Sequence, residues 1–264
     1  MNCCRHELIR GINMTEELAR TLRRYTSARV GLNRAGSAWA TCEVLDFQMA
    51  HAQARDAVHA ALDVPSLLGE LRERGLLVCV LRSAAPDRAT YLRHPDMGRA
   101  LARESAAKLV AAPCDVVLVI ADGLSALAVV RHTLPLLDEA LPLLNAQLSV
   151  GPICIVEQGR VAIGDAIGAA LQAKISVVLI GERPGLSSPD SLGAYITWAP
   201  RPGRTDAERN CISNIRPEGL EYAVAARMLA FYLHQALRQK LTGIGLKLVG
   251  DFRVEGARGL LSGG

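Results

Sequence analysis

Short apolar runs rich in β-branched residues recur through the second half of the chain, separated by longer stretches with helical spacing. Each run is too short for a buried helix, so it predicts a strand buried on both faces. The predicted strands are residues 76–81, 115–121, 153–156, 175–180 and 194–198. The predicted helices are residues 98–110, 124–144, 161–174 and 220–240. Strands that alternate with helices indicate a parallel sheet with crossover helices.

The pattern before the first strand is helical instead. Residues 14–28 are amphipathic, and Thr15 stands where it can cap such a helix. Residues 40–63 carry apolar side chains at helical spacing and predict a second helix. A glycine-containing loop, residues 29–36, separates the two, and Pro65 ends the second helix and can open another.

These elements predict an α/β fold with a mostly parallel sheet, flanking helices and an N-terminal helical part. The predicted boundaries lie where the pattern changes. The N-terminal helical region covers residues 1–65, and the α/β domain with ligand-facing loops covers residues 66–250. The glycine-rich residues 251–264 are predicted to form a flexible tail.

Composition narrows the classes of function. Of the 264 residues, 50% are hydrophobic and 21% charged, which is typical of a globular protein. The net charge of +4 is mild and aromatic residues make up only 4%, which argues against nucleic-acid binding. No apolar run reaches the roughly 18 residues of a membrane helix, and the N-terminus lacks the apolar region of a signal peptide.

Cysteine usage points to a reducing compartment. The seven cysteines are odd in number and show no C-x-x-C spacing, which argues against a disulfide framework and a zinc cluster. A cytoplasmic protein is therefore expected. Cys79, Cys114 and Cys154 lie in or beside apolar runs and are expected to act as small hydrophobic side chains.

A ligand of an open parallel sheet binds at the carboxyl ends of the strands. Polar residues and glycines follow each of the first four predicted strands. They are Ser83, Asp122, Gly123, Glu157, Gln158, Gly159, Gly181, Glu182 and Arg183. The fourth strand is followed by residues 181–217, a long stretch whose prolines and glycines can fix a backbone close to a ligand.

Common catalytic fingerprints are absent. Neither the G-x-G-x-x-G pattern of dinucleotide-binding proteins nor a P-loop occurs. Ser125 follows a strand, where a nucleophile elbow would lie, but Leu127 occupies the position that needs a second glycine. We therefore interpret Ser125 as a residue that starts a helix.

Three further features leave alternatives open. His51, Arg55 and His59 share one face of the second predicted helix, which favours a polar or interface face over a metal site. Glu182 and Arg183 are interpreted equally well as a loop salt bridge or as ligand contacts. Cys211 taken by itself is typical of a buried cysteine.

Long motifs of mixed residues indicate a protein family more specifically than any single residue does. "GERPGLSSPDSLGAYITWAPRPGRTDAERNCISNIRPEGLEYAVAA" strongly resembles the small (light) subunit of ethanolamine ammonia-lyase. "ARVGLNRAG", "HAQARDAVH", "DRATYLRHPDMGRAL", "DVVLVIADGLSALAV" and "GRVAIGDAIGAAL" resemble the same family in the same order. The resemblance extends from about Ala28 to Lys247.

The resemblance implies an adenosylcobalamin-dependent enzyme that converts ethanolamine to acetaldehyde and ammonia by a radical route. A TIM-barrel large subunit would bind ethanolamine and carry the catalytic residues. This chain would be a Rossmann-like α/β subunit with an N-terminal helical part and would carry no catalytic residue. The family pattern implies cobalamin contacts from Val161, Glu182 and Cys211 at the interface of a hetero-oligomer. The resemblance also allows a location inside a bacterial microcompartment, with residues 1–28 as the targeting segment and Leu18, Leu22 and Tyr25 as its apolar stripe. An ordinary packed or frayed helix explains the same residues equally well.

Two other functions stay open at this point. A stand-alone enzyme on the same sheet would need a nucleophile or a nucleotide fingerprint, and the sequence shows neither. A scaffolding role would leave the lyase site wholly on the partner. Replacement of Glu182 separates that role from cofactor binding.

Overall fold

The structure, a computed structural model, describes residues 17–26 and 28–247. These residues form two compact units. The first reaches to Arg55 and includes Gly185–Pro189, and the second comprises Asp56–Pro184 and the residues from Asp190 onward. The sequence-based boundary at residue 65 and the flexible tail stay predictions, and the tail lies outside the described residues.

The first unit has little sheet. Residues 17–22 are helical, which agrees with the described part of the helix expected over residues 14–28. Two short antiparallel strands, β1 (Arg34–Ala35) and β2 (Ala38–Trp39), follow within and after the expected loop. Helix α2 (Thr41–His59) then confirms the second predicted helix, although it ends four residues earlier than expected.

The second unit is built on a six-stranded sheet in the order β3-β5-β4-β6-β7-β8. Strands β3 to β6 are parallel, and β7 and β8 are antiparallel to their neighbours. The strands are β3 (Val78–Arg82), β4 (Cys114–Ala121), β5 (Val150–Glu157), β6 (Ala173–Gly181), β7 (Leu192–Trp198) and β8 (Arg209–Ile215). All five predicted strands are therefore confirmed. β8 was missed because Asn210, Ser213 and Asn214 interrupt its apolar residues, so its sequence shows neither an apolar run nor a strict alternation.

Helices connect and cover the strands. Helices α6 and α8 confirm the predictions over residues 124–144 and 220–240, and Pro65 opens α3. The prediction over residues 98–110 is wrong, because only a 3-10 turn and four residues of α5 are helical there. The helix expected over residues 161–174 is shorter, since its last two residues already belong to β6. The helices are α3 (Val64–Glu73), α4 (Arg88–Arg93), α5 (Arg103–Ala106), α6 (Ala126–Asn145), α7 (Ile163–Leu171) and α8 (Tyr222–Gln239), with 3-10 turns η1 (Met97–Arg99), η2 (Asp206–Glu208) and η3 (Gly243–Gly245).

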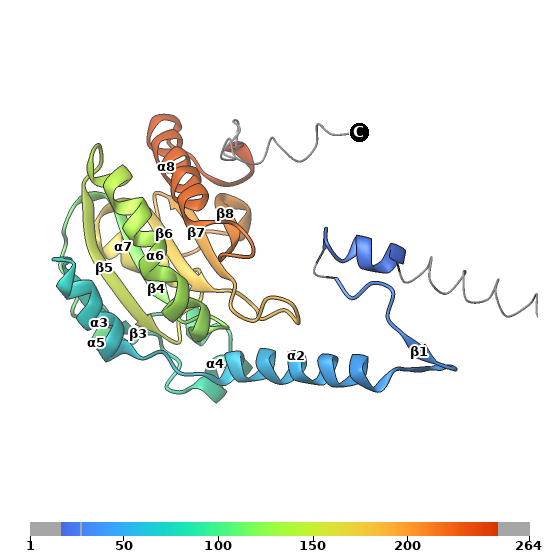
Figure 1. The fold of residues 1–264 in the computed structure, drawn as a ribbon. Coiled ribbons are helices and arrows are strands. Elements are labelled where there is room, and N and C mark those ends of the chain that lie inside the picture. Colours follow the sequence, from blue (N-terminus) through green and yellow to red (C-terminus); the bar gives the residue numbers. More distant parts are fainter. Residues whose placement is uncertain (1–16, 27, 248–264) are drawn as a thin grey trace, which may run out of the picture. The chain divides into compact units, whose positions relative to one another are not determined.

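The sheet is buried on both faces, as expected for strands without polar alternation. Successive residues of β4 belong to two separate apolar cores: Val116, Leu118 and Ile120 pack in one, and Val117 and Val119 in the other. The first core also contains apolar residues of α3, α6 and α8, whereas the second contains those of α7. Figure 1 labels these helices and the strands of the sheet.

The α/β class with a mostly parallel sheet and flanking helices is thus confirmed. The Rossmann-like detail is not, because the strand order differs from the 3-2-1-4-5-6 order of that fold. Cys114 and Cys154 are buried among apolar side chains, and Cys79 packs beside them, as the sequence predicted.

Candidate functional site

Asp122, directly after β4, organises the carboxyl edge of the sheet. Its carboxylate accepts hydrogen bonds from the backbone N–H groups of Gln158 and Gly159, both at 3.0 Å, and Arg88 Nη1 lies 3.6 Å away. Burial raises the pKa of Asp122, and these donors oppose that shift without cancelling it. Asp122 is only 1% exposed, so its role is to fix the loop after β5 against the end of β4.

The start of α6 and the end of β6 meet just beside Asp122. A side chain on Gly181 would overlap the carbonyl oxygen of Ser125, so only glycine allows this approach. Ser125 is fully buried, and its hydroxyl accepts a hydrogen bond from Ala128 N–H at 3.3 Å as the N-cap of α6. The interpretation of Ser125 as a helix-start residue is confirmed.

Tyr91 of α4 lies between two arginines. The guanidinium carbons of Arg88 and Arg160 lie 4.8 and 4.2 Å from the centre of its ring. The Tyr91 hydroxyl donates to the carbonyl of Gly159 at 3.1 Å, and burial raises its pKa to about 12, so it stays a neutral donor. This arrangement was not predicted, because Arg160 follows β5 and meets the Arg88 and Tyr91 side chains of α4 only in the folded chain.

A cavity of about 470 Å³ opens at this edge. Val161 and Glu182 both line it, so the structure brings together two of the three residues implied by the resemblance. Tyr91, Arg160 and Tyr195 provide further walls. The cavity therefore combines a carboxylate and a guanidinium with apolar and aromatic surface, which suits a large ligand with polar edges.

Glu182 is half-buried and is hydrogen-bonded to the end of its own loop and to strand β8. Its Oε2 accepts from the Ser191 hydroxyl and from the backbone N–H of Asn214, the latter at 3.1 Å. Arg183 is exposed, and among the described residues no ion pair joins it to Glu182. The alternative of a Glu182–Arg183 loop salt bridge is therefore wrong.

Cys211 lies on the edge strand β8, directly opposite Tyr195 of β7. Its side chain is exposed, so the expectation of an ordinary buried cysteine is wrong. Its sulfur lies 3.1 Å from the Ser213 hydroxyl, and partial desolvation raises the pKa of the thiol. A neutral thiol is a poor nucleophile. Cys211 is absent from the lining of the cavity and is next to it only through Tyr195.

A buried ion pair supports the strand that carries Cys211. Arg209 donates from Nη1 and Nη2 to the two carboxylate oxygens of Asp165, each at 2.7 Å, and also to Thr197 Oγ1 at 2.8 Å. Both charged side chains are 2% exposed. Burial alone would lower the pKa of Arg209, but the hydrogen bond and the charge of Asp165 outweigh it and raise the pKa. The pair joins α7, which begins two residues after Val161, to β8.

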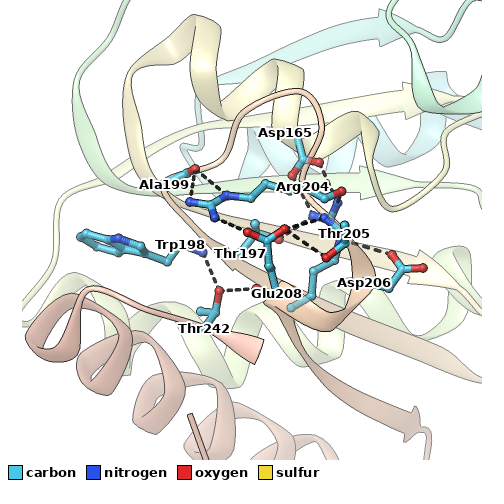
Figure 2. Close-up of polar contacts among 10 residues, drawn as sticks. Asp165, Thr197, Trp198, Ala199, Arg204, Thr205, Asp206, Glu208 and Thr242 are labelled. Atoms are coloured by element: carbon cyan, nitrogen blue, oxygen red, sulfur yellow. Dashed lines mark hydrogen bonds and ion pairs between the residues drawn. The ribbon is translucent and has the colours of Figure 1, made fainter. Parts of the chain in front are cut away.

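The loop before β8 is fixed by a second set of contacts, drawn in Figure 2. Arg204 donates to the carbonyl of Ala199 and to the carboxylate of Glu208. Glu208 in turn accepts from Thr205 N–H at 2.8 Å, and these contacts lower the pKa of Glu208 to about 2. The loop between β7 and β8, residues 199–208, is thus held in place by hydrogen bonds from its own polar side chains.

Other candidates are not supported as sites. His51, Arg55 and His59 are all exposed on α2, consistent with a polar helix face. Within residues 17–26 and 28–247, no three histidine, cysteine, aspartate or glutamate side chains gather as metal ligands would. No helix in the same residues is both long and apolar enough to cross a membrane.

The motifs that surround this cavity are matched by a family model. The model for the ethanolamine ammonia-lyase light chain (EutC) matches residues 16–247, which is most of the chain. This chain belongs to the ethanolamine ammonia-lyase light chain family. The resemblance noted in the sequence is thereby confirmed.

Curated relatives agree with the family match. The chain is 55% identical over 240 residues to the ethanolamine ammonia-lyase small subunit of Azotobacter vinelandii, covering 88% of this chain and 89% of that protein. It is 53% identical over 233 residues to the small subunit of Pseudomonas aeruginosa, covering 86% and 85%. The small subunit of Xanthomonas campestris is 52% identical over 233 residues, with 86% of each chain covered.

Proposed function

We propose that this chain is the small subunit of an adenosylcobalamin-dependent ethanolamine ammonia-lyase. Together with a TIM-barrel large subunit, it would convert ethanolamine to acetaldehyde and ammonia. Its own share is to form part of the cobalamin site at the subunit interface, while the partner binds ethanolamine and carries the catalytic residues. The observation that carries the proposal is that Val161 and Glu182 line one cavity at the carboxyl edge of the sheet.

The residues of the cavity fit such a cofactor. Cobalamin is rimmed with amides, and a carboxylate oxygen of Glu182 can accept their N–H groups. Arg160 lines the same cavity, and its buried Nε has no hydrogen-bond partner within the described residues. Val161 offers apolar contact, and Cys211 offers a soft, polarisable surface beyond Tyr195.

In this proposal the cofactor supplies the chemical step, and this chain holds the cofactor in position. When bound, the cofactor supplies a radical through homolysis of its cobalt–carbon bond. This chain contributes position: Asp122 fixes the loop that leads to Val161, and β6 ends directly before Glu182, which lines the same cavity. Neither Ser125, which is buried as a helix cap, nor Cys211, whose thiol is neutral, acts as a nucleophile in this proposal.

Replacement of Glu182 tests the cofactor contact. In the complex with the large subunit, Glu182→Ala is expected to weaken adenosylcobalamin binding about tenfold, the value of one hydrogen bond to a charged group. Equilibrium dialysis measures the affinity, and size-exclusion chromatography checks that the complex still forms. Glu157→Ala is the matched control, because Glu157 ends β5 but does not line the cavity. Unchanged affinity in the assembled Glu182→Ala complex would favour the scaffolding role.

We also propose that residues 1–28 direct the enzyme into a bacterial microcompartment. Leu18, Leu22 and Tyr25 are 59%, 45% and 83% exposed, so the apolar stripe is available to a partner. Deletion of residues 1–20 is expected to disperse a fused fluorescent reporter that is otherwise punctate in cells that form the compartment. Double substitution of exposed Arg99 and Arg103 to alanine is the control. An unchanged pattern after the deletion would reject targeting.

A further inference from the structure

The Glu182 carboxylate is bonded on one oxygen and open on the other. Oε2 accepts from the Ser191 hydroxyl and from the Asn214 backbone, whereas Oε1 accepts no hydrogen bond among the described residues. Ser191 is only 5% exposed, so its bond to Glu182 is shielded from water. The backbone joins the same two residues a second time, because Glu182 N–H donates to the Ser191 carbonyl at 2.9 Å.

Asn214 is aimed at Glu182 by an unusual backbone. Its φ of +60° lies in the left-handed region, which asparagine tolerates better than most residues. Leu220 N–H donates to the Asn214 carbonyl at 2.7 Å, and Arg216 Nε donates to its side-chain oxygen at 3.1 Å. A side chain on Gly219 would overlap the same carbonyl, so the turn closes only with glycine there. This turn leaves the Asn214 N–H free to donate to Glu182.

Gly193 provides the space that the carboxylate occupies. A Cβ at this position would lie 2.8 Å from Glu182 Oε1 and 3.1 Å from its Cγ. The backbone of Gly193 is not left-handed, and the three nearest atoms that an alanine methyl group would meet here all belong to Glu182. Gly193 is therefore a position where one methyl group acts first on the Glu182 side chain.

We propose that Ser191, Gly193 and the Asn214 backbone are positioning elements for Glu182. They saturate Oε2 and seat the side chain above Gly193, so that Oε1 is the oxygen left to accept an amide N–H of the cofactor. The inference rests on the proposed function, since it assigns how one of its contacts is oriented. An oriented acceptor binds more tightly than a free one because less side-chain freedom is lost on binding.

The test measures adenosylcobalamin affinity by equilibrium dialysis in the complex with the large subunit. Ser191→Ala and Gly193→Ala are each expected to weaken binding about tenfold, comparable to the loss of one charged hydrogen bond. Ser191→Thr, which keeps a hydroxyl, is expected to restore most of the affinity. Ser176→Ala is the matched control, because Ser176 is a buried serine of β6 whose hydroxyl has no partner within the described chain.

A double-mutant cycle separates positioning from general damage to the fold. In a Glu182→Ala background, Ser191→Ala is expected to cause no further loss, because its effect passes through the missing carboxylate. Wild-type affinity of Ser191→Ala and Gly193→Ala, with Glu182→Ala still weakened, would overturn the inference and leave the proposed function intact. An equal loss from Ser191→Ala in both backgrounds would also overturn it. Full affinity of Glu182→Ala would overturn the proposed contact and the inference together.

Discussion

Acetaldehyde is expected only when this chain and its large subunit are mixed with ethanolamine and adenosylcobalamin. Each chain alone should give no activity above background, because the described residues of this chain supply one wall of the proposed cofactor site and no activated nucleophile. Ser125 is buried as a helix cap, and the pKa of Cys211 is raised. A coupled assay measures acetaldehyde in three samples: this chain alone, the large subunit alone and the mixture of the two.

The controls decide what a negative result means. Size-exclusion chromatography of the mixture shows whether a complex forms, and heat-denatured small subunit mixed with the large one gives the background. Activity from the large subunit alone would show that this chain is dispensable for catalysis. A stable complex that never forms acetaldehyde would refute the proposed reaction and return the chain to a scaffolding role.

Arg209→Met is expected to lower the free energy of unfolding by about 3–5 kcal/mol, the usual cost of removing one partner of a buried ion pair. The change leaves the Asp165 carboxylate 2% exposed, without the two hydrogen bonds at 2.7 Å that it now accepts. Water cannot replace those bonds without opening the contact between α7 and β8. Urea denaturation followed by circular dichroism measures the loss.

Arg74→Met is the matched control for this prediction. Arg74 also forms a bidentate salt bridge, donating to the two carboxylate oxygens of Asp138 at 2.8 and 3.0 Å. Its side chain and that of Asp138 are 32% and 53% exposed. Solvent screening should limit its loss to about 1 kcal/mol or less. Equal losses at the two positions would show that burial adds nothing to the Arg209 pair. The double variant Asp165→Leu with Arg209→Met should recover much of the stability, since no unpaired charge stays buried.

The sequence predicted those elements whose burial produces a continuous local pattern of apolar residues. The run over residues 115–121 became β4 almost to the residue, because a strand covered on both faces needs apolar side chains throughout. β8 was missed for the opposite reason: Asn210, Ser213 and Asn214 interrupt its apolar positions. Residues 98–110 have helical composition, yet they form only the end of a 3-10 turn and the short α5, and Gly98 lies against Tyr91 and Arg160.

The candidate site was predicted in outline. The rule that ligands lie at the carboxyl ends of parallel strands selected Asp122 and Glu182, and the family resemblance added Val161 and Cys211. Their different settings were not predictable: Val161 and Glu182 share a cavity, whereas Cys211 lies on an exposed edge strand. That difference depends on the pairing of β7 with β8, which no local sequence pattern predicts.

The sequence by itself determined the α/β class, the helix start at Ser125 and membership of the ethanolamine ammonia-lyase light chain family. These properties depend on the spacing and identity of residues close together along the chain. Only the tertiary structure decided that Arg209 meets Asp165 44 positions away, that Tyr91 lies between two arginines, and that Ser191 and Asn214 bond one oxygen of Glu182. Such contacts follow from strand order and register, which emerge when distant segments pack into one core, so they cannot be deduced from any segment alone.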